Sequence, residues 1–306
     1  MFQSILVPLD GSPFGEHAFP IARNIARRIG ARLQLAHVHV AAAPLAVDAL
    51  PGFDEALDLE HRAREQAYLA AVADRLHACG VADVSAVLLE DPIVTAIHNH
   101  AVKSGADLIV MTTHGRGALS RFWLGSVADT LVRRTTLAVL MVRPHDTELD
   151  LSRDRSFHRV LIPLDGSALA EQMISRAVAL GALDDTGYTL LQAIDPTAVY
   201  LPDPQGDGAG DQLIDQVRAA ARRYLDRVAG KLRAAGFHVQ AETVVGPPAA
   251  AILSFARDHA VDLIAMETHG RGGLTRLLLG SVADKVLRSA AVPVLLHRPS
   301  NGERHI

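Results

Sequence analysis

The sequence is poor in several features that would assign a protein to a class at once. Among its 306 residues only Cys79 is a cysteine, so no disulfide can form within the chain. Lys and Arg number 30 against 34 Asp and Glu, whereas a nucleic-acid surface needs clustered basic residues. No uncharged apolar run approaches the roughly 18 residues of a transmembrane helix, and the N-terminus lacks a signal-peptide pattern. We therefore predict a cytoplasmic protein with neither nucleic acid nor membrane as partner.

Histidine, by contrast, is abundant, with 15 residues that could suggest a metal site. His37 and His39 alternate along an expected strand and so share one of its faces. Neither has Cys or carboxylate residues at the spacing of a structural zinc site. We predict no metal site from this pattern.

An internal repeat is the strongest organisational feature of the chain. Three motifs each occur twice, always 155 residues apart. They are Pro-Leu-Asp-Gly-Ser at 8–12 and 163–167, Thr-His-Gly-Arg-Gly at 113–117 and 268–272, and Leu-Gly-Ser-Val-Ala-Asp at 124–129 and 279–284. At about 150 residues per domain the length also predicts two domains. We place them at 1–145 and 158–306, joined by a charged linker at 146–157.

Each copy alternates short apolar segments with segments of helical periodicity. In the first copy we expect strands at 4–9, 32–40, 84–89, 107–111 and 137–142, and helices at 15–29, 54–78, from 92 onward and 126–134. This alternation predicts an α/β fold of two tandem Rossmann-like domains, each a five-stranded parallel sheet with helices on both faces.

The segment 114–126 carries the residues that point to a ligand. It starts where the fourth expected strand ends and stops where a helix begins, which is where open α/β sheets bind ligands. Gly115 permits close approach of backbone N–H groups to a phosphate, and Gly125-Ser126 begins a helix whose N-terminus attracts anions. The segment is neither a Walker A loop nor a dinucleotide fingerprint. Ser126 and Asp129 also resemble a capping box, which needs no ligand.

The acidic residues that follow the first strand of each copy have two interpretations. Asp10 and Asp165 lie at the carboxyl edge of the expected sheets, where a carboxylate could contact a ribose or a phosphate-bound Mg²⁺. Each also begins an Asp-Gly-Ser tripeptide, which is typical of a turn or helix cap. Both interpretations stay open.

A first strand ending in Pro-x-Asp-Gly-Ser, followed late in the domain by Thr-His-Gly-Arg and Gly-Ser-Val-Ala, resembles the universal stress protein family. The resemblance covers nearly the whole chain, twice, and implies a fold of the adenine nucleotide alpha hydrolase-like type. Nucleotide-binding members carry Gly-x2-Gly-x9-Gly-Ser/Thr and bind ATP or a related adenine nucleotide. Here Gly115, Gly125 and Ser126 match that pattern, but Thr112 and, in the second copy, Glu267 replace its first glycine.

The resemblance implies a set of nucleotide-contacting positions in both copies. In the first copy these are Pro8, Leu9, Asp10, Val38, Met111, Thr112, His114, Gly115, Arg116, Gly125, Ser126 and Val127. In the second copy they are Asp165, Ala193, Met266, His269, Gly270, Gly280, Ser281 and Val282. Val38, Ala193 and the two methionines could equally be core residues at strand ends. Because Glu267 would repel a polyphosphate unless it turned to the ribose hydroxyls or a metal, we expect the first repeat to be the better site.

These patterns lead to a function without an assigned catalytic residue. The expected function is an adenine-nucleotide-binding regulatory or stress-response protein, with ATP, ADP or AMP as ligand and Mg²⁺ as an option. One alternative is a slow ATP hydrolase, although no Walker lysine or water-positioning base accompanies the loop. Another is a nucleotide-free dimerisation or docking module. The apolar last strands call for a partner. The family resemblance implies that these strands pair across a dimer interface, so we expect an internal pseudo-dimer of the two repeats and a homodimer of chains.

Overall fold

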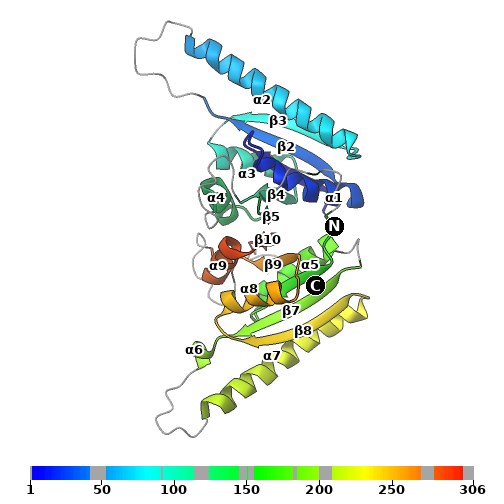
Figure 1. The fold of residues 1–306 in the computed structure, drawn as a ribbon, viewed down its shortest axis with the longest axis vertical. Coiled ribbons are helices and arrows are strands. Elements are labelled where there is room, and N and C mark those ends of the chain that lie inside the picture. Colours follow the sequence, from blue (N-terminus) through cyan, green and yellow to red (C-terminus); the bar gives the residue numbers. More distant parts are fainter. Residues whose placement is uncertain are drawn as a thin grey trace. The chain divides into compact units, whose positions relative to one another are not determined.

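A computed structural model describes residues 2–41, 53–90, 92–113, 124–144, 150, 155–181, 185–199, 209–269 and 279–298. The chain divides into two compact units, drawn in Figure 1. Unit 1 comprises Met1–Leu131 and Val142–Arg155, and unit 2 comprises Val132–Met141 and Ser156–Ile306. The domain boundaries 1–145 and 158–306 stay a prediction.

Unit 1 is built on parallel strands in the order β3-β2-β1-β4. The strands span β1 (Ser4–Leu9), β2 (Arg32–His39), β3 (Val84–Glu90) and β4 (Leu108–Thr112). The other elements that begin in this unit are the 3-10 helix η1 (Gly15–Ala18), α1 (Phe19–Ile29), α2 (Phe53–Ala78), α3 (Ile93–Lys103) and α4 (Ser126–Arg134). The long helix α2 lies alongside β2 and β3 (Figure 1).

Unit 2 repeats this plan with five parallel strands in the order β8-β7-β6-β9-β10. They span β6 (Arg159–Pro163), β7 (Gly187–Ile194), β8 (His238–Val245), β9 (Leu263–Glu267) and β10 (Val294–His297). Its helices are α5 (Ala168–Gly181), α6 (Pro196–Val199), α7 (Ala209–Ala234), α8 (Pro248–Asp258) and α9 (Ser281–Ser289). The segment 132–141 contributes most of β5 (Ala138–Val142), which pairs antiparallel with β10.

The core explains why the central strands are nearly continuous runs of apolar residues. Parallel strands are covered on both faces, so both sets of alternating side chains are buried. Every residue of β4 and of β9 is buried, including Thr112 and Glu267. The predicted α/β fold with two Rossmann-like domains is confirmed. Within the described residues, no helix has both the length and the apolar character required to cross a membrane.

Candidate functional site

The strand order of unit 1 creates a natural place for a ligand. From β1 the chain proceeds to β2 and β3 on one side, whereas β4 pairs with β1 on the other side. The order therefore reverses between β1 and β4, and in open α/β sheets the crevice beyond the carboxyl ends of such strands is the usual binding site. In unit 1 this crevice lies beyond Leu9 and Thr112.

A cavity of about 860 Å³ opens at this position, within the range of pockets that bind small molecules. Its walls come from the ends of β1, β2 and β4, from α2 and α3, and from the start of α4. The lining residues are Pro8, Leu9, Asp10, Gly15, His37, Val38, Val40, His61, Arg64, Glu65, Ile93, Ile97, Met111, Thr112, Thr113, Gly125, Ser126, Val127 and Ala128. All of the expected unit-1 residues that the structure describes are in this set. His114, Gly115 and Arg116 lie outside the described residues.

Asp10 forms the local turn that its sequence suggests. Its Oδ1 accepts hydrogen bonds from the Ser12 N–H at 3.0 Å and the Ser12 hydroxyl at 2.7 Å. Gly11 between them has a φ of 76°, which favours glycine. Asp165 and Ser167 repeat the arrangement at 2.9 and 2.6 Å. The carboxylate thus has a structural role in the turn, and in unit 1 the same residue lines the cavity.

The N-terminus of α4 presents backbone donors to the cavity, but not all the expected ones. The Gly125 N–H donates to the Thr113 carbonyl at 2.8 Å, and Asp129 N–H closes the first helical hydrogen bond to Gly125 O at 2.9 Å. The Gly125 amide is therefore engaged within the chain. First-turn amides of a helix have no partner within that helix, so Ser126, Val127 and Ala128 are the residues whose amides can meet an anion here.

The equivalent glycine in unit 2 shows why this position excludes a side chain. Gly280 N–H donates to the Thr268 carbonyl at 2.8 Å. A Cβ on Gly280 would lie 2.7 Å from that carbonyl oxygen, although its φ of −58° is ordinary. The close approach of two backbone segments therefore requires glycine, whatever the ligand.

Glu267, the residue expected to disfavour a polyphosphate in unit 2, is turned into the protein. Its carboxylate lies 2.9 Å from Nδ1 of His297, and the two side chains are 1% and 2% exposed. Burial, assisted by the positive charge of Arg176, lowers the pKa of His297 to about 3. A hydrogen bond to the backbone of Thr136 raises the pKa of His297, but burial dominates because an added charge there would be poorly solvated.

The remaining expected residues of unit 2 lie at corresponding strand and helix ends. Ala193 and Met266 are on β7 and β9, and Ser281 and Val282 begin α9. The ring of His269 is turned to its neighbour, with Nδ1 2.9 Å from the Thr268 hydroxyl. Gly270 lies outside the described residues.

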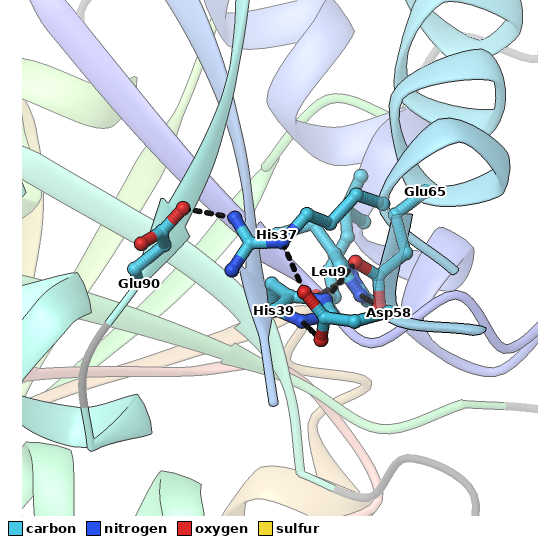
Figure 2. Close-up of polar contacts among 7 residues, drawn as sticks. Leu9, His37, His39, Asp58, Glu65 and Glu90 are labelled. Carbon is cyan, nitrogen blue, oxygen red and sulfur yellow. Dashed lines mark hydrogen bonds and ion pairs between the residues drawn. The ribbon is translucent and has the colours of Figure 1, made fainter. Parts of the chain in front are cut away.

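A polar network on the α2 side of the unit-1 cavity was not expected from the sequence. Figure 2 shows Asp58 and Glu65 of α2 meeting His39 of β2. Glu65 also faces His37 Nε2 at 3.3 Å, and His37 Nδ1 contacts the Leu9 carbonyl at 2.9 Å. Arg62 contacts Asp58 at 2.7 Å and also Glu90 of β3. The signals available were the alternating histidines of β2 and the acidic residues spaced along α2.

His39 is the centre of this network. Its Nδ1 lies 2.7 Å from Glu65 and its Nε2 lies 2.7 Å from Asp58, in a residue that is 4% exposed. Both ring nitrogens therefore face carboxylate oxygens, an arrangement that suits the doubly protonated ring. Burial lowers the pKa of His39, but the hydrogen bonds to Glu65 and Asp58 outweigh that effect and raise it above 6.5. Among the described residues, no group of three or more His, Cys, Asp or Glu could hold a metal ion.

The strand order and the place of the cavity define this chain as a tandem Rossmann-like α/β protein. The sequence model of the universal stress protein family matches it twice, over residues 1–143 and 156–298. The chain belongs to the universal stress protein family.

Individual relatives agree with this assignment. A universal stress protein of Mycobacterium tuberculosis is 31% identical over 71% of this chain and 69% of its own length. One of Synechocystis is 24% identical over 97% of this chain and 100% of its own length. The crystal structure of a universal stress protein from Archaeoglobus fulgidus has a TM-score of 0.66 at 20% identity, covering 98% of this chain and 97% of that one. This likeness concerns the fold alone.

Proposed function

We propose that unit 1 binds an adenine nucleotide, with ATP as the principal ligand, and that the protein acts as a nucleotide-dependent regulatory or stress-response protein. The observation that carries this proposal is the cavity at the β1–β4 switch point. Its lining includes every described unit-1 residue that the family pattern implies. Nucleotide sites of open α/β sheets occupy this position.

The two ends of the cavity differ in chemistry, and this difference supports an orientation for the ligand. At one end the first turn of α4, with Ser126, offers backbone donors and the positive end of a helix dipole, which suit phosphate groups. One part of the lining is apolar, with Val38, Ile97 and Met111, and such a wall suits a planar base. In this orientation Asp10, which lines the cavity, would contact the ribose or a phosphate-bound Mg²⁺.

We infer that unit 1 is the better site, for a reason that differs in part from the sequence-based expectation. The Glu267 carboxylate contacts His297 and is 1% exposed. Direct repulsion between this carboxylate and a polyphosphate is therefore not the main reason for the asymmetry. The asymmetry also involves the long helices, since aligning Tyr68 of α2 with Tyr224 of α7 places Val217 and Ala220 opposite His61 and Arg64. Unit 2 therefore lacks polar groups that line the unit-1 cavity.

Titration calorimetry with ATP, ADP and AMP, with and without Mg²⁺, tests the proposal. Ser126→Asp adds a negative charge at the α4 N-terminus and should weaken ATP binding at least about tenfold. The matched control is Ser281→Asp, the same change at the same place in unit 2; both serines are exposed, so neither change disturbs the core. Equal losses in both variants would contradict the asymmetry, and no heat with wild-type protein would contradict nucleotide binding.

Two other functions make distinct predictions. A slow ATP hydrolase would release phosphate in proportion to bound ATP, and Gly115→Ala would reduce both quantities. A nucleotide-free docking module would yield no AMP, ADP or ATP on extraction of denatured protein. An internal pseudo-dimer, a homodimer of chains and a cytoplasmic location stay predictions of the sequence.

A further inference from the structure

Helix α2 packs through one stripe of residues whose chemistry changes halfway along it. Leu69, Val72 and Leu76 are buried in its C-terminal half. The same helical face continues toward the N-terminus as Glu65, Arg62 and Asp58, because the spacings of three and four residues follow the helical period. Of the described side chains of α2 before Leu69, none is fully buried. In the N-terminal half, the contacts of Asp58, Arg62 and Glu65 with the sheet are polar.

His39 connects that polar half to the sheet. Together Asp58 and Glu65 grip its ring from α2, one carboxylate on each nitrogen. Around it, the charged and titratable groups are Asp58, Arg62 and Glu65 on α2, Glu90 on β3, which is in register with His39, and His37 on its own strand. The positive charge of Arg62 offsets only one of the three carboxylates, which are Asp58, Glu65 and Glu90. A proton on His39 reduces the remaining negative charge where α2 meets the sheet.

The same contacts reach the cavity. Glu65, one of the two carboxylates on His39, lines the cavity, as do His61 and Arg64 from the same half of α2 and His37 from β2. The Glu65 carboxylate lies 3.3 Å from His37 Nε2 and 2.7 Å from His39 Nδ1, so a single carboxylate joins the cavity-lining His37 to His39. The position of this cavity wall therefore depends on the contacts of His39.

We propose that His39 is a positioning residue of the unit-1 site, which in its protonated form holds the N-terminal half of α2 as a wall of the cavity, so that ligand affinity in unit 1 falls as pH rises. The predicted effect on ligand affinity rests on the proposed function, which identifies the ligand as an adenine nucleotide. The predicted effect of pH on helix α2 does not depend on the ligand.

The sign of the effect follows from the direction of the shift. Folding raises the pKa of His39 above its ordinary value of 6.5. The stabilisation is then fully present below about 6.5 and is lost as pH rises through the folded-state value. The network should be tightest in mildly acidic solution and loosest in alkaline solution.

Unit 2 provides an internal control. Where unit 1 has His39, unit 2 has Ile194, and the helix alignment places Ala221 opposite Glu65. Ala221 is buried, so the apolar contact of α7 begins at the position where α2 has a carboxylate. At these aligned positions unit 2 has no His–carboxylate pair, so helix α7 should not show the same pH response.

Hydrogen exchange followed by mass spectrometry, with the full chain and no nucleotide, tests the positioning role directly. After correction for intrinsic exchange rates, residues 55–68 of wild type should lose protection at least about fivefold between pH 6 and pH 8.5. Helix α7 should show no such change. His39→Gln should leave residues 55–68 weakly protected at both pH values. Equal protection at both pH values in wild type would overturn the proposal.

ATP binding provides the second measurement, and the ratio of dissociation constants for His39→Gln and wild type cancels the titration of the ligand's own phosphates. This ratio should be about fivefold or more at pH 6 and approach one at pH 8.5. A ratio near one throughout, with ATP bound, would overturn the inference and leave the proposed function intact. Absence of ATP binding at every pH would instead refute the function, while the exchange result would still decide the role of His39.

A second variant covers the case in which His39→Gln does not fold. Asp58→Asn removes one of the two carboxylates from His39 at a partly exposed position, with 27% of the Asp58 side chain accessible. The pH at which residues 55–68 lose protection should then move downward, because one group that raises the pKa of His39 is gone. An unchanged midpoint would contradict the proposal.

Discussion

Helices α2 and α7 have the same length of 26 residues and follow the second strand of their repeats, yet they pack differently. Their C-terminal halves are alike, since Leu69 and Val72 correspond to Leu225 and Val228, and all four are buried. Their N-terminal halves diverge, with charged residues in α2 and half-buried apolar residues such as Ile214 and Val217 in α7. The two repeats therefore share the apolar C-terminal half of the helix and differ in the chemistry of its N-terminal half.

The largest effect should come from removing the shared anchors. Leu69→Ala and Leu225→Ala each truncate a buried side chain; Leu69 is 3% exposed and Leu225 is 0% exposed. Each should reduce the free energy of unfolding of its own unit by about 2–5 kcal/mol. Hydrogen exchange during denaturant titration would assign the loss to one unit. A much smaller loss for Leu69→Ala would mean that the polar half of α2 contributes more than its contacts suggest.

A smaller effect should separate structural from ligand-related glycines. Gly280→Ala forces a Cβ to within 2.7 Å of the Thr268 carbonyl and should destabilise unit 2 by about 1–3 kcal/mol without any nucleotide present. Gly230→Ala is the control, because nothing lies within 4 Å of a Cβ there and the residue is inside α7. It should stabilise the unit by about 0.5–1 kcal/mol. If Gly280→Ala did not change the stability of unit 2, the structural explanation for this glycine would be wrong and a role in ligand binding would be favoured.

The smallest effect should come from pH alone. A rise in pH should change the stabilities of the two units in opposite directions. The pKa of His39 in unit 1 is raised, so its stabilisation decreases as pH rises above about 6.5. The pKa of His297 in unit 2 is lowered to about 3, so its contribution is present above the unfolded value of 6.5 and is lost as pH falls toward 3. Unit-resolved hydrogen exchange at pH 5, 7 and 8.5 measures both. A common direction would contradict this comparison.

Much of the fold was predictable because it follows from the order of apolar residues. The expected bounds of β1 and α4 coincide with those observed, since apolar runs and capping residues are local signals. The unit-1 cavity was also predictable in outline, because a reversal of strand order brings the ends of β1 and β4 together. The family resemblance assigned residues as far apart as Leu9 and Met111 to one site, and the strand order explains why they line one cavity.

Other features of the site depend on choices that no local pattern contains. The engagement of the Gly125 amide by Thr113 requires the backbone path between strand and helix. The inward orientation of Glu267 could not be predicted, because its partner His297 is 30 residues away in the sequence. Asp58 and Glu65, which contact His39, lie 19 and 26 positions away in the sequence. The length of the intervening segment does not specify which face of α2 contacts β2.

By itself the sequence determined the duplicated α/β scaffold, the order of its elements and the edge of the sheet where a ligand can bind. Those features depend on apolar periodicity and chain connectivity, which are written along the chain. Only the tertiary structure decided the partners of the charged side chains, because the energy of a charge depends on its burial and on distances of a few ångströms to other charges. For that reason the histidines of β2 showed their role only once α2 was in place.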